Sequence, residues 1–160
     1  MDWQYWTDAG ILAPAPTGRV RVEPTIRRAW QRVVDARAGY CKGDWETTDA
    51  QIRLAFSTAS HALVCYHYLD LYGECDFKLA EEFAVHFFGE SLVVPMFDRA
   101  RKLRTMMPLD RTIPEMTARK VRDCVASSSA YVALVECCTY RDEPVPRFSF
   151  DAANCYIRRT

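Results

Sequence analysis

The chain has 160 residues and a formal net charge of zero, with 21 Lys and Arg residues against 21 Asp and Glu residues. This length corresponds to one domain, residues 1–160, and an apolar content of 49% supplies enough side chains for a core, which excludes a disordered chain. No apolar stretch reaches the roughly 18 residues that a membrane span needs. The first 20 residues show no secretory signal, so we expect a cytosolic protein with no membrane partner.

The N-terminal half predicts an arm followed by two helices. Residues 1–24 combine aromatic residues with proline and glycine and lack helical periodicity, which indicates an ordered, extended arm. Apolar residues then recur at helical spacing over 25–39, where a glycine ends the first helix. Thr47 or Thr48 caps a second helix that ends near Gly73. We expect these two helices to pack as an antiparallel pair.

Two further helices are predicted in the C-terminal half. A helical stripe begins at Phe77, and Pro95 kinks or ends this third helix. Thr112 and Glu115 then form a capping box, which starts a fourth helix that runs to about Tyr140. The predicted fold is therefore all-α: a four-helix bundle over residues 25–140 with extended N- and C-terminal segments, the latter being the tail 141–160.

The histidines and cysteines give only a weak indication of chemistry. Seven cysteines without a C-x-x-C motif predict reduced, mostly buried thiols. His61 and Cys65 lie one helical turn apart and His67 is close by, a spacing that can seed a metal site if Cys75 or His86 approaches. We expect packing roles for these residues and predict no metal and no cofactor. No catalytic motif is present, so we predict that the protein is not an enzyme.

The net charge of zero conceals a segregated distribution. Residues 99–122 hold eight basic and two acidic residues, a local surplus of +6. Basic groups that follow the third helix can complement its dipole, but those in the first turns of the fourth helix lie near a positive N-terminus. If these helices are antiparallel, both groups meet at one end of the bundle. This convergence favours phosphate binding over a simple solvated charged face.

Several short motifs follow one another in a fixed order over residues 45–151. They are Trp45-Glu46-Thr47-Thr48-Asp49-Ala50, Asp76-Phe77-Lys78-Leu79, Ala84-Val85, Phe97-Asp98, Thr117-Ala118-Arg119-Lys120-Val121-Arg122-Asp123, Val135-Glu136 and Ser149-Phe150-Asp151. In order and spacing this set resembles the coat proteins of rod-shaped plant RNA viruses, the tobacco mosaic virus type. Lys102, Arg119, Lys120 and Asp123 fall on basic and acidic positions of that family.

The resemblance implies a structural capsid protein that self-assembles helically around single-stranded genomic RNA, located in the virion and the host cell cytoplasm. An RNA-proximal loop at about 99–118 would bind phosphate and ribose without reading sequence. The implied RNA-binding residues are Arg99, Arg101, Lys102, Arg104, Arg119, Lys120, Arg122 and Asp123. The implied subunit-interface residues are Asp98, Asp110 and Glu115.

The sequence is also compatible with a protein-binding function. A small cytosolic helical adaptor would bind a host protein through the aromatic arm or through the acidic segment 70–90. Overall neutrality suits a protein whose copies pack densely, because a large net charge would make every contact between copies repulsive. The local basic surplus and the overall neutrality together favour the capsid protein.

Overall fold

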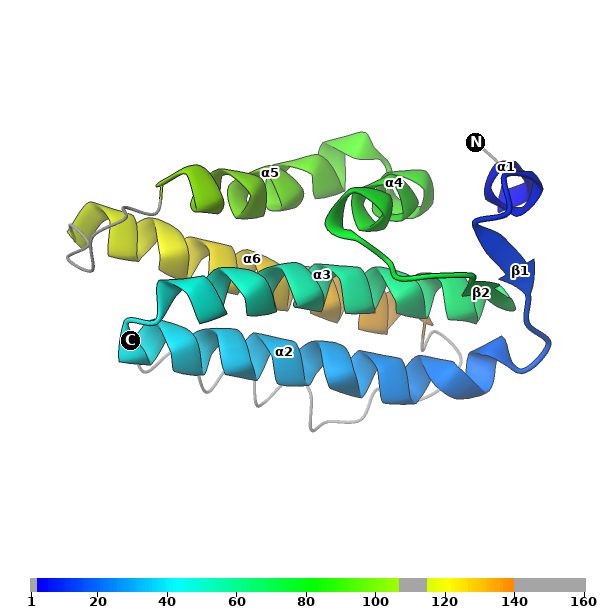
Figure 1. Cartoon of the computed structure of the whole chain (residues 1–160), viewed down its shortest axis with the longest axis horizontal. Helices are drawn as coiled ribbons and strands as arrows, with labels where there is room; N and C mark the ends of the chain where they lie inside the picture. Colours follow the sequence, from blue (N-terminus) through cyan, green and yellow to red (C-terminus); the bar gives the residue numbers. More distant parts are fainter. Residues whose placement is uncertain (1–2, 107–114, 140–160) are drawn as a thin grey trace.

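The computed structural model describes residues 3–106 and 115–139, and over these residues the fold is mostly helical, as predicted (Figure 1). Four long helices lie side by side along the molecule, and the N-terminal elements cover one end. The predicted tail lies outside the described residues. The elements in chain order are α1 (Trp3–Asp8), β1 (Leu12–Pro14), the 3-10 helix η1 (Gly18–Arg21), α2 (Val22–Lys42), α3 (Trp45–Tyr66), β2 (Leu69–Leu71), α4 (Phe77–Phe88), α5 (Glu90–Met106) and α6 (Glu115–Thr139).

Helices α2 and α3 form the expected antiparallel pair (Figure 1). The prediction that Gly39 ends the first helix is wrong, because α2 continues to Lys42 and stops at Gly43, which adopts a left-handed φ of 69°. Gly39 is instead buried against α3, where an added Cβ would lie 2.7 Å from the Thr48 hydroxyl oxygen. Gly39 therefore permits close helix packing, and Gly43 provides the helix end.

The ends of α3 also differ from the prediction. Asp44, and neither threonine, is the N-cap, because its carboxylate accepts a hydrogen bond of 3.0 Å from the Thr47 backbone amide. Hydrogen bonds from the Thr47 hydroxyl and amide lower the pKa of Asp44. At the other end α3 stops at Tyr66, well before Gly73, since the chain reverses at Tyr68 with a φ of 59°.

The N-terminal arm is ordered as expected, but the prediction of an extended segment is wrong. It contains a short helix, a strand and a 3-10 turn, and β1 pairs antiparallel with β2 so that Leu12 lies opposite Leu71. Trp6 and Leu12 are buried against Val64 and Phe83, which belong to α3 and α4. Burial of these large side chains holds the arm on one end of the helical body.

The predicted third helix is two helices. The chain breaks at Gly89, which adopts a φ of 86°, and α5 starts at Glu90. Pro95 does not end α5, because it lies early in the helix, where its missing amide removes a single backbone hydrogen bond. The buried residues Val93 and Phe97 continue the apolar stripe past the proline. Residues 99–106 are therefore helical and are not part of a loop; within the predicted loop, only 107–114 lie outside the described residues.

The centre of the core is an aromatic cluster shared by α3, α5 and α6. Phe56 and Phe97 have ring centroids 4.5 Å apart, and Tyr131 stacks on Phe56 at 4.9 Å. The Ser60 hydroxyl donates to the Ala80 carbonyl oxygen at 3.0 Å, so the Tyr131 hydroxyl donates to Ser60 at 2.6 Å. Burial raises the pKa of Tyr131, which therefore stays protonated and keeps α3, α4 and α6 connected.

The start of α4 offers a local test of this description. The Asp76 carboxylate accepts a hydrogen bond of 2.7 Å from the Leu79 amide, which makes Asp76 the N-cap. We expect Asp76→Ala to lower the free energy of unfolding by about 1 kcal/mol, because an amide at the helix start loses its acceptor. Urea denaturation measures this loss, and Asp76→Asn, which keeps an acceptor oxygen, should retain most of the stability. Equal losses in both variants would contradict the capping role.

A histidine under the arm predicts how stability depends on pH. His67 lies 5.0 Å from the Trp3 ring, and its buried Nε2 has no hydrogen-bond partner among the described residues. Burial lowers the pKa of His67, and the nearby His86 and Arg19 lower it further. The unfolded chain therefore binds a proton below pH 6.5 that the folded chain rejects, so stability falls as the pH falls. In urea titrations from pH 7 to 5, His67→Phe should lose less stability than the wild type; parallel losses would refute this.

Candidate nucleic-acid interface

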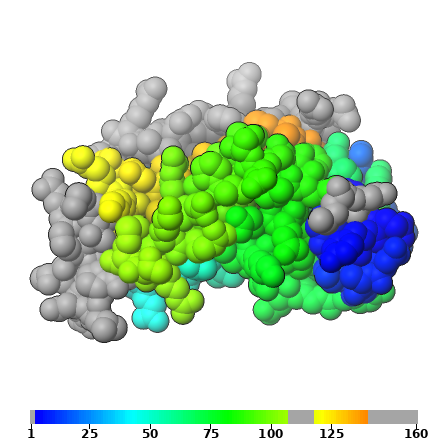
Figure 2. Space-filling view, turned by 90° about the horizontal axis from the view of Figure 1, so that it is seen from above, coloured from blue at the N-terminus to red at the C-terminus, as the bar shows by residue number. Residues whose placement is uncertain are grey.

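The two basic groups that the sequence places on successive helices lie at the same end of the molecule. Helices α5 and α6 run antiparallel, so the last turns of α5 face the first turns of α6, at the end opposite the arm (Figure 1). Figure 2 shows the same separation from above, with the N-terminal residues at the far end from this junction. The predicted convergence of residues 99–104 with residues 119–122 is confirmed.

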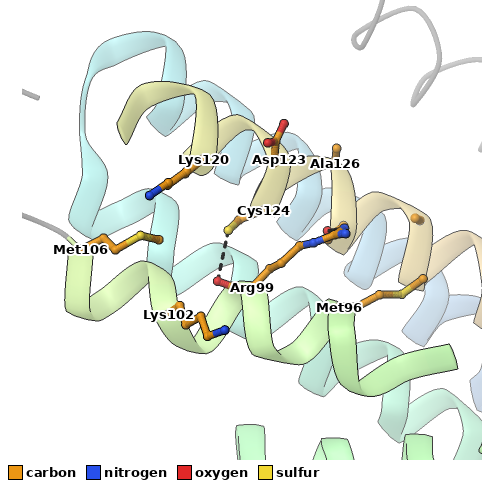
Figure 3. Close-up of a pocket in the computed structure, with 10 residues that line it drawn as sticks. Met96, Arg99, Lys102, Met106, Lys120, Asp123, Cys124 and Ala126 are labelled. Carbon is orange, nitrogen blue, oxygen red and sulfur yellow. Dashed lines mark hydrogen bonds between the residues drawn. The ribbon is translucent and has the colours of Figure 1, made fainter. Parts of the chain in front are cut away.

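A groove of about 660 Å³ runs between α5 and α6 at this end (Figure 3). The α5 wall carries Met96, Arg99, Lys102 and Met106 at helical spacing, and α6 provides the opposite wall. Apolar atoms make up most of the lining of the groove, and Arg99, Lys102 and Lys120 are among the residues that line it. Its α6 residues are Lys120, Asp123, Cys124, Ala126, Ser127 and Ala130.

Arg99 and Cys124 hold the two walls of the groove together. The Arg99 guanidinium reaches across and donates a hydrogen bond of 3.1 Å to the Ser127 hydroxyl. The Cys124 thiol donates to the Arg99 carbonyl oxygen, with a sulfur to oxygen distance of 3.3 Å (Figure 3). Burial raises the pKa of Cys124 to about 11, so this donor keeps its proton at neutral pH. Arg99 therefore has a structural contact in addition to its charge.

Arg101 is occupied by carboxylates of its own chain. Its guanidinium forms ion pairs with Glu81 on α4 and with Asp98 one turn earlier on α5. The hydrogen bond to Glu81 contributes most to raising the pKa of Arg101. Asp98, which the resemblance places in a contact between subunits, pairs with Arg101 of its own chain.

The remaining basic residues differ from Arg101 in their availability. Four of them are exposed and form no ion pair with any residue in the described ranges, and they are Lys102, Arg104, Arg119 and Lys120. Arg122 lies 4.0 Å from the Asp123 carboxylate, a long contact between exposed groups. The predicted interface residue Asp110 lies outside the described residues, and Glu115 is placed only as the first residue of α6.

Sequence reasoning missed the apolar part of the groove. Met96 and Met106 form its surface on α5, and Ala126 and Ala130 keep the α6 wall low enough to leave the groove open. Met96, Arg99, Lys102 and Met106 are spaced three or four residues apart, which places them on one face of a helix. This spacing is the feature of the sequence from which the groove wall could have been predicted. Apolar lining atoms beside basic side chains on both walls suit a ligand that carries apolar surface together with phosphates.

In the sequence, His61, Cys65 and His67 have a spacing that can seed a metal site, although we predict packing roles for them. The structure separates His67 from the other two residues. His67 lies among the aromatic rings of Trp3 and Phe87. His61 and Cys65 are joined instead by Asp70 of β2, and the potential ligand atoms of these three residues lie within 4.8 Å of one another.

Comparisons with known proteins add no relationship to this description. No protein family, curated protein or solved structure matches the chain. Among the helices in the described ranges, none is long and apolar enough to cross a membrane.

Proposed function

We propose that this protein is a structural capsid subunit that assembles helically around single-stranded viral RNA and protects it through phosphate contacts that do not depend on sequence. The observation that carries the proposal is the convergence of four exposed cations, Lys102, Arg104, Arg119 and Lys120, at one end of an antiparallel helix pair. None of the four forms an ion pair with residues 3–106 or 115–139. Clustered cations of this kind attract phosphates, because each contact releases counterions from the nucleic acid.

The distribution of charge favours a coat over an isolated RNA-binding protein. The whole chain is neutral, so copies can pack closely without mutual repulsion, while the groove end stays locally basic. One RNA strand passing each copy would meet the same cations every time. Contacts to phosphates fix the position of a nucleic acid without specifying its sequence, as a coat for a whole genome requires.

The arrangement of the long helices is compatible with the architecture that the resemblance implies. In this proposal α2, α3, α5 and α6 form the four-helix bundle of a rod-forming coat protein, with the groove end facing the RNA. The arm and the β1–β2 pair then lie at the end away from the RNA. Contacts between neighbouring copies would involve the sides of the bundle.

Electron microscopy of the purified full chain tests the proposal. We expect discs or rods in negative stain at mildly acidic pH, and RNA that survives nuclease treatment within them. The amount of protected RNA should follow the amount of assembled protein across a salt series. A protein that stays monomeric at every pH and salt concentration, with no protected RNA, would refute the proposal.

The adaptor function is the second candidate, and one observation favours it. Large apolar side chains are exposed at the arm end, with Val20 at 78%, Tyr72 at 73% and Tyr5 at 58% of their full exposure. Such residues suit contact with another protein, although self-assembly would also bury them. The double variant Val20→Asp with Tyr72→Asp distinguishes the two functions. If the protein is an adaptor, the variant loses its protein partner, and neither the wild type nor the variant protects RNA. If it is a coat protein, the variant still binds short RNA.

A further inference from the structure

Three side chains able to bind a metal converge where the strand β2 folds back on α3. His61 and Cys65 lie one turn apart on α3 and therefore point to the same side of the helix. The chain reverses at Tyr68 in a left-handed conformation, and this reversal returns Asp70 to the same place. The His61 Nε2 atom lies 2.9 Å from the Asp70 Oδ1 atom.

The surroundings of the cluster hold its ligands in position. Arg21 of η1 forms an ion pair with the Oδ2 atom of Asp70, so the other carboxylate oxygen faces the histidine. The Leu71 backbone amide donates to that same oxygen at 2.9 Å, which fixes the carboxylate further. Groups that fix a ligand in this way are common around metal sites. A carboxylate with one oxygen held by a cation can still offer the other oxygen to a metal ion.

We propose that His61, Cys65 and Asp70 form a binding site for a zinc-like divalent cation, with one nitrogen, one sulfur and one oxygen ligand. Zinc accepts this mixture of ligands, and three protein ligands leave its fourth position for water. The ligand atoms lie within 4.8 Å of one another, whereas ligands of tetrahedral zinc are separated by about 3.3–3.8 Å. Binding would require the most widely separated of these atoms to move about 1 Å closer together.

The burial of the three residues gives the site one open side. Cys65 is fully buried, while the side chains of His61 and Asp70 keep 25% and 28% of their exposure. A cation would enter from solvent past the histidine and the carboxylate and meet the sulfur behind them. On binding it replaces the hydrogen bond between His61 and Asp70 and displaces the thiol proton of Cys65, which passes to solvent.

The proposed metal site lies between the arm and the helical body. Cys65 belongs to the last turn of α3, and Asp70 belongs to the strand that pairs with β1 of the arm. A bound cation would therefore connect the arm to the helical body through ligands. This connection lies at the opposite end of the molecule from the basic groove, so the metal site does not rest on the proposed RNA contacts.

Cobalt spectroscopy on the full chain, reduced and freed of metal by a chelator, tests the site. Titration with Co²⁺ should produce a thiolate-to-cobalt absorption band together with the strong visible bands of tetrahedral cobalt, and Zn²⁺ should displace both. We expect Cys65→Ser to abolish the thiolate band. Asp70→Asn should weaken binding by at least about 10-fold, the smallest loss typical of changing a group that only supports a ligand. Because other cysteines are present, Cys75→Ser and His67→Gln serve as matched controls and should bind within about twofold of the wild type.

A second measurement keeps the proposal falsifiable if Cys65→Ser does not fold. His61 is partly exposed, so His61→Ala should fold, and Zn²⁺ should raise the melting temperature of the wild type but not of this variant. Absence of a thiolate band in the wild type would overturn the proposal. An unchanged band in folded Cys65→Ser, or an equal zinc-dependent shift in His61→Ala, would also overturn it.

Discussion

Reversing the charge of the two groove lysines is expected to abolish RNA protection. Lys102 and Lys120 line opposite walls of the groove and form no ion pair with the residues that the structure places. In Lys102→Glu with Lys120→Glu, affinity for a short single-stranded RNA should fall more than about tenfold, uniformly across sequences. The slope of log affinity against log salt should decrease by about 1.4, since each single-strand phosphate contact contributes about 0.7. Fluorescence anisotropy at several salt concentrations measures both quantities.

A matched variant separates a local effect from the effect of net charge. Arg27→Glu with Lys78→Glu makes the same change in total charge at exposed positions of α2 and α4, outside the groove. This control should keep the affinity and the salt slope of the wild type. Arg101→Gln should have a smaller effect than Lys102→Gln, because Glu81 and Asp98 already neutralise Arg101. If the groove and control variants lose affinity equally, the groove is not the RNA site.

The helices could be predicted from the sequence, because they depend on apolar periodicity. The points where helices end could not, because they depend on backbone geometry. The buried stripes of α2 and α3 revealed both helices and their pairing. A sequence cannot distinguish Gly39, which lets two helices approach, from Gly43, which ends a helix, because both are glycines near the end of one stripe. A proline also looks like a helix end unless its distance from the helix start is known, as Pro95 demonstrates.

The candidate site likewise could be predicted only in part. The basic residues on α5 and α6 could be predicted, because charge is visible in the sequence and antiparallel packing brings the two groups together. The capture of Arg101 by Glu81 could not be predicted, since it depends on how α4 crosses α5 after the break at Gly89. The position of Asp70, and not His67, beside Cys65 likewise depends on the backbone reversal at Tyr68. Tyr68 has a positive φ although it is not a glycine, so the sequence does not reveal this reversal.

Removing the ring of Phe97 is expected to cost a large part of the stability of the fold. Phe97 is fully buried on α5, and its ring lies 4.5 Å from Phe56 of α3 and 5.2 Å from Tyr131 of α6. Phe97→Ala should lower the free energy of unfolding by about 3–5 kcal/mol, because it removes apolar burial and leaves a cavity among rigid helices. Domains are typically stable by only about 5–15 kcal/mol, so urea denaturation should show a much earlier midpoint.

The comparison with Tyr131→Phe identifies the source of this loss. That variant keeps the ring stacked on Phe56 and removes only the hydroxyl that donates to Ser60, so we expect a cost of about 1 kcal/mol. Ser60 retains its own hydrogen bond to the Ala80 carbonyl oxygen and keeps α3 joined to α4. Since α5 forms one wall of the groove, Phe97→Ala should also weaken RNA binding, in proportion to the unfolded fraction. A loss as large in Tyr131→Phe as in Phe97→Ala would mean that the buried hydrogen bonds, and not the packed rings, dominate the stability of this core.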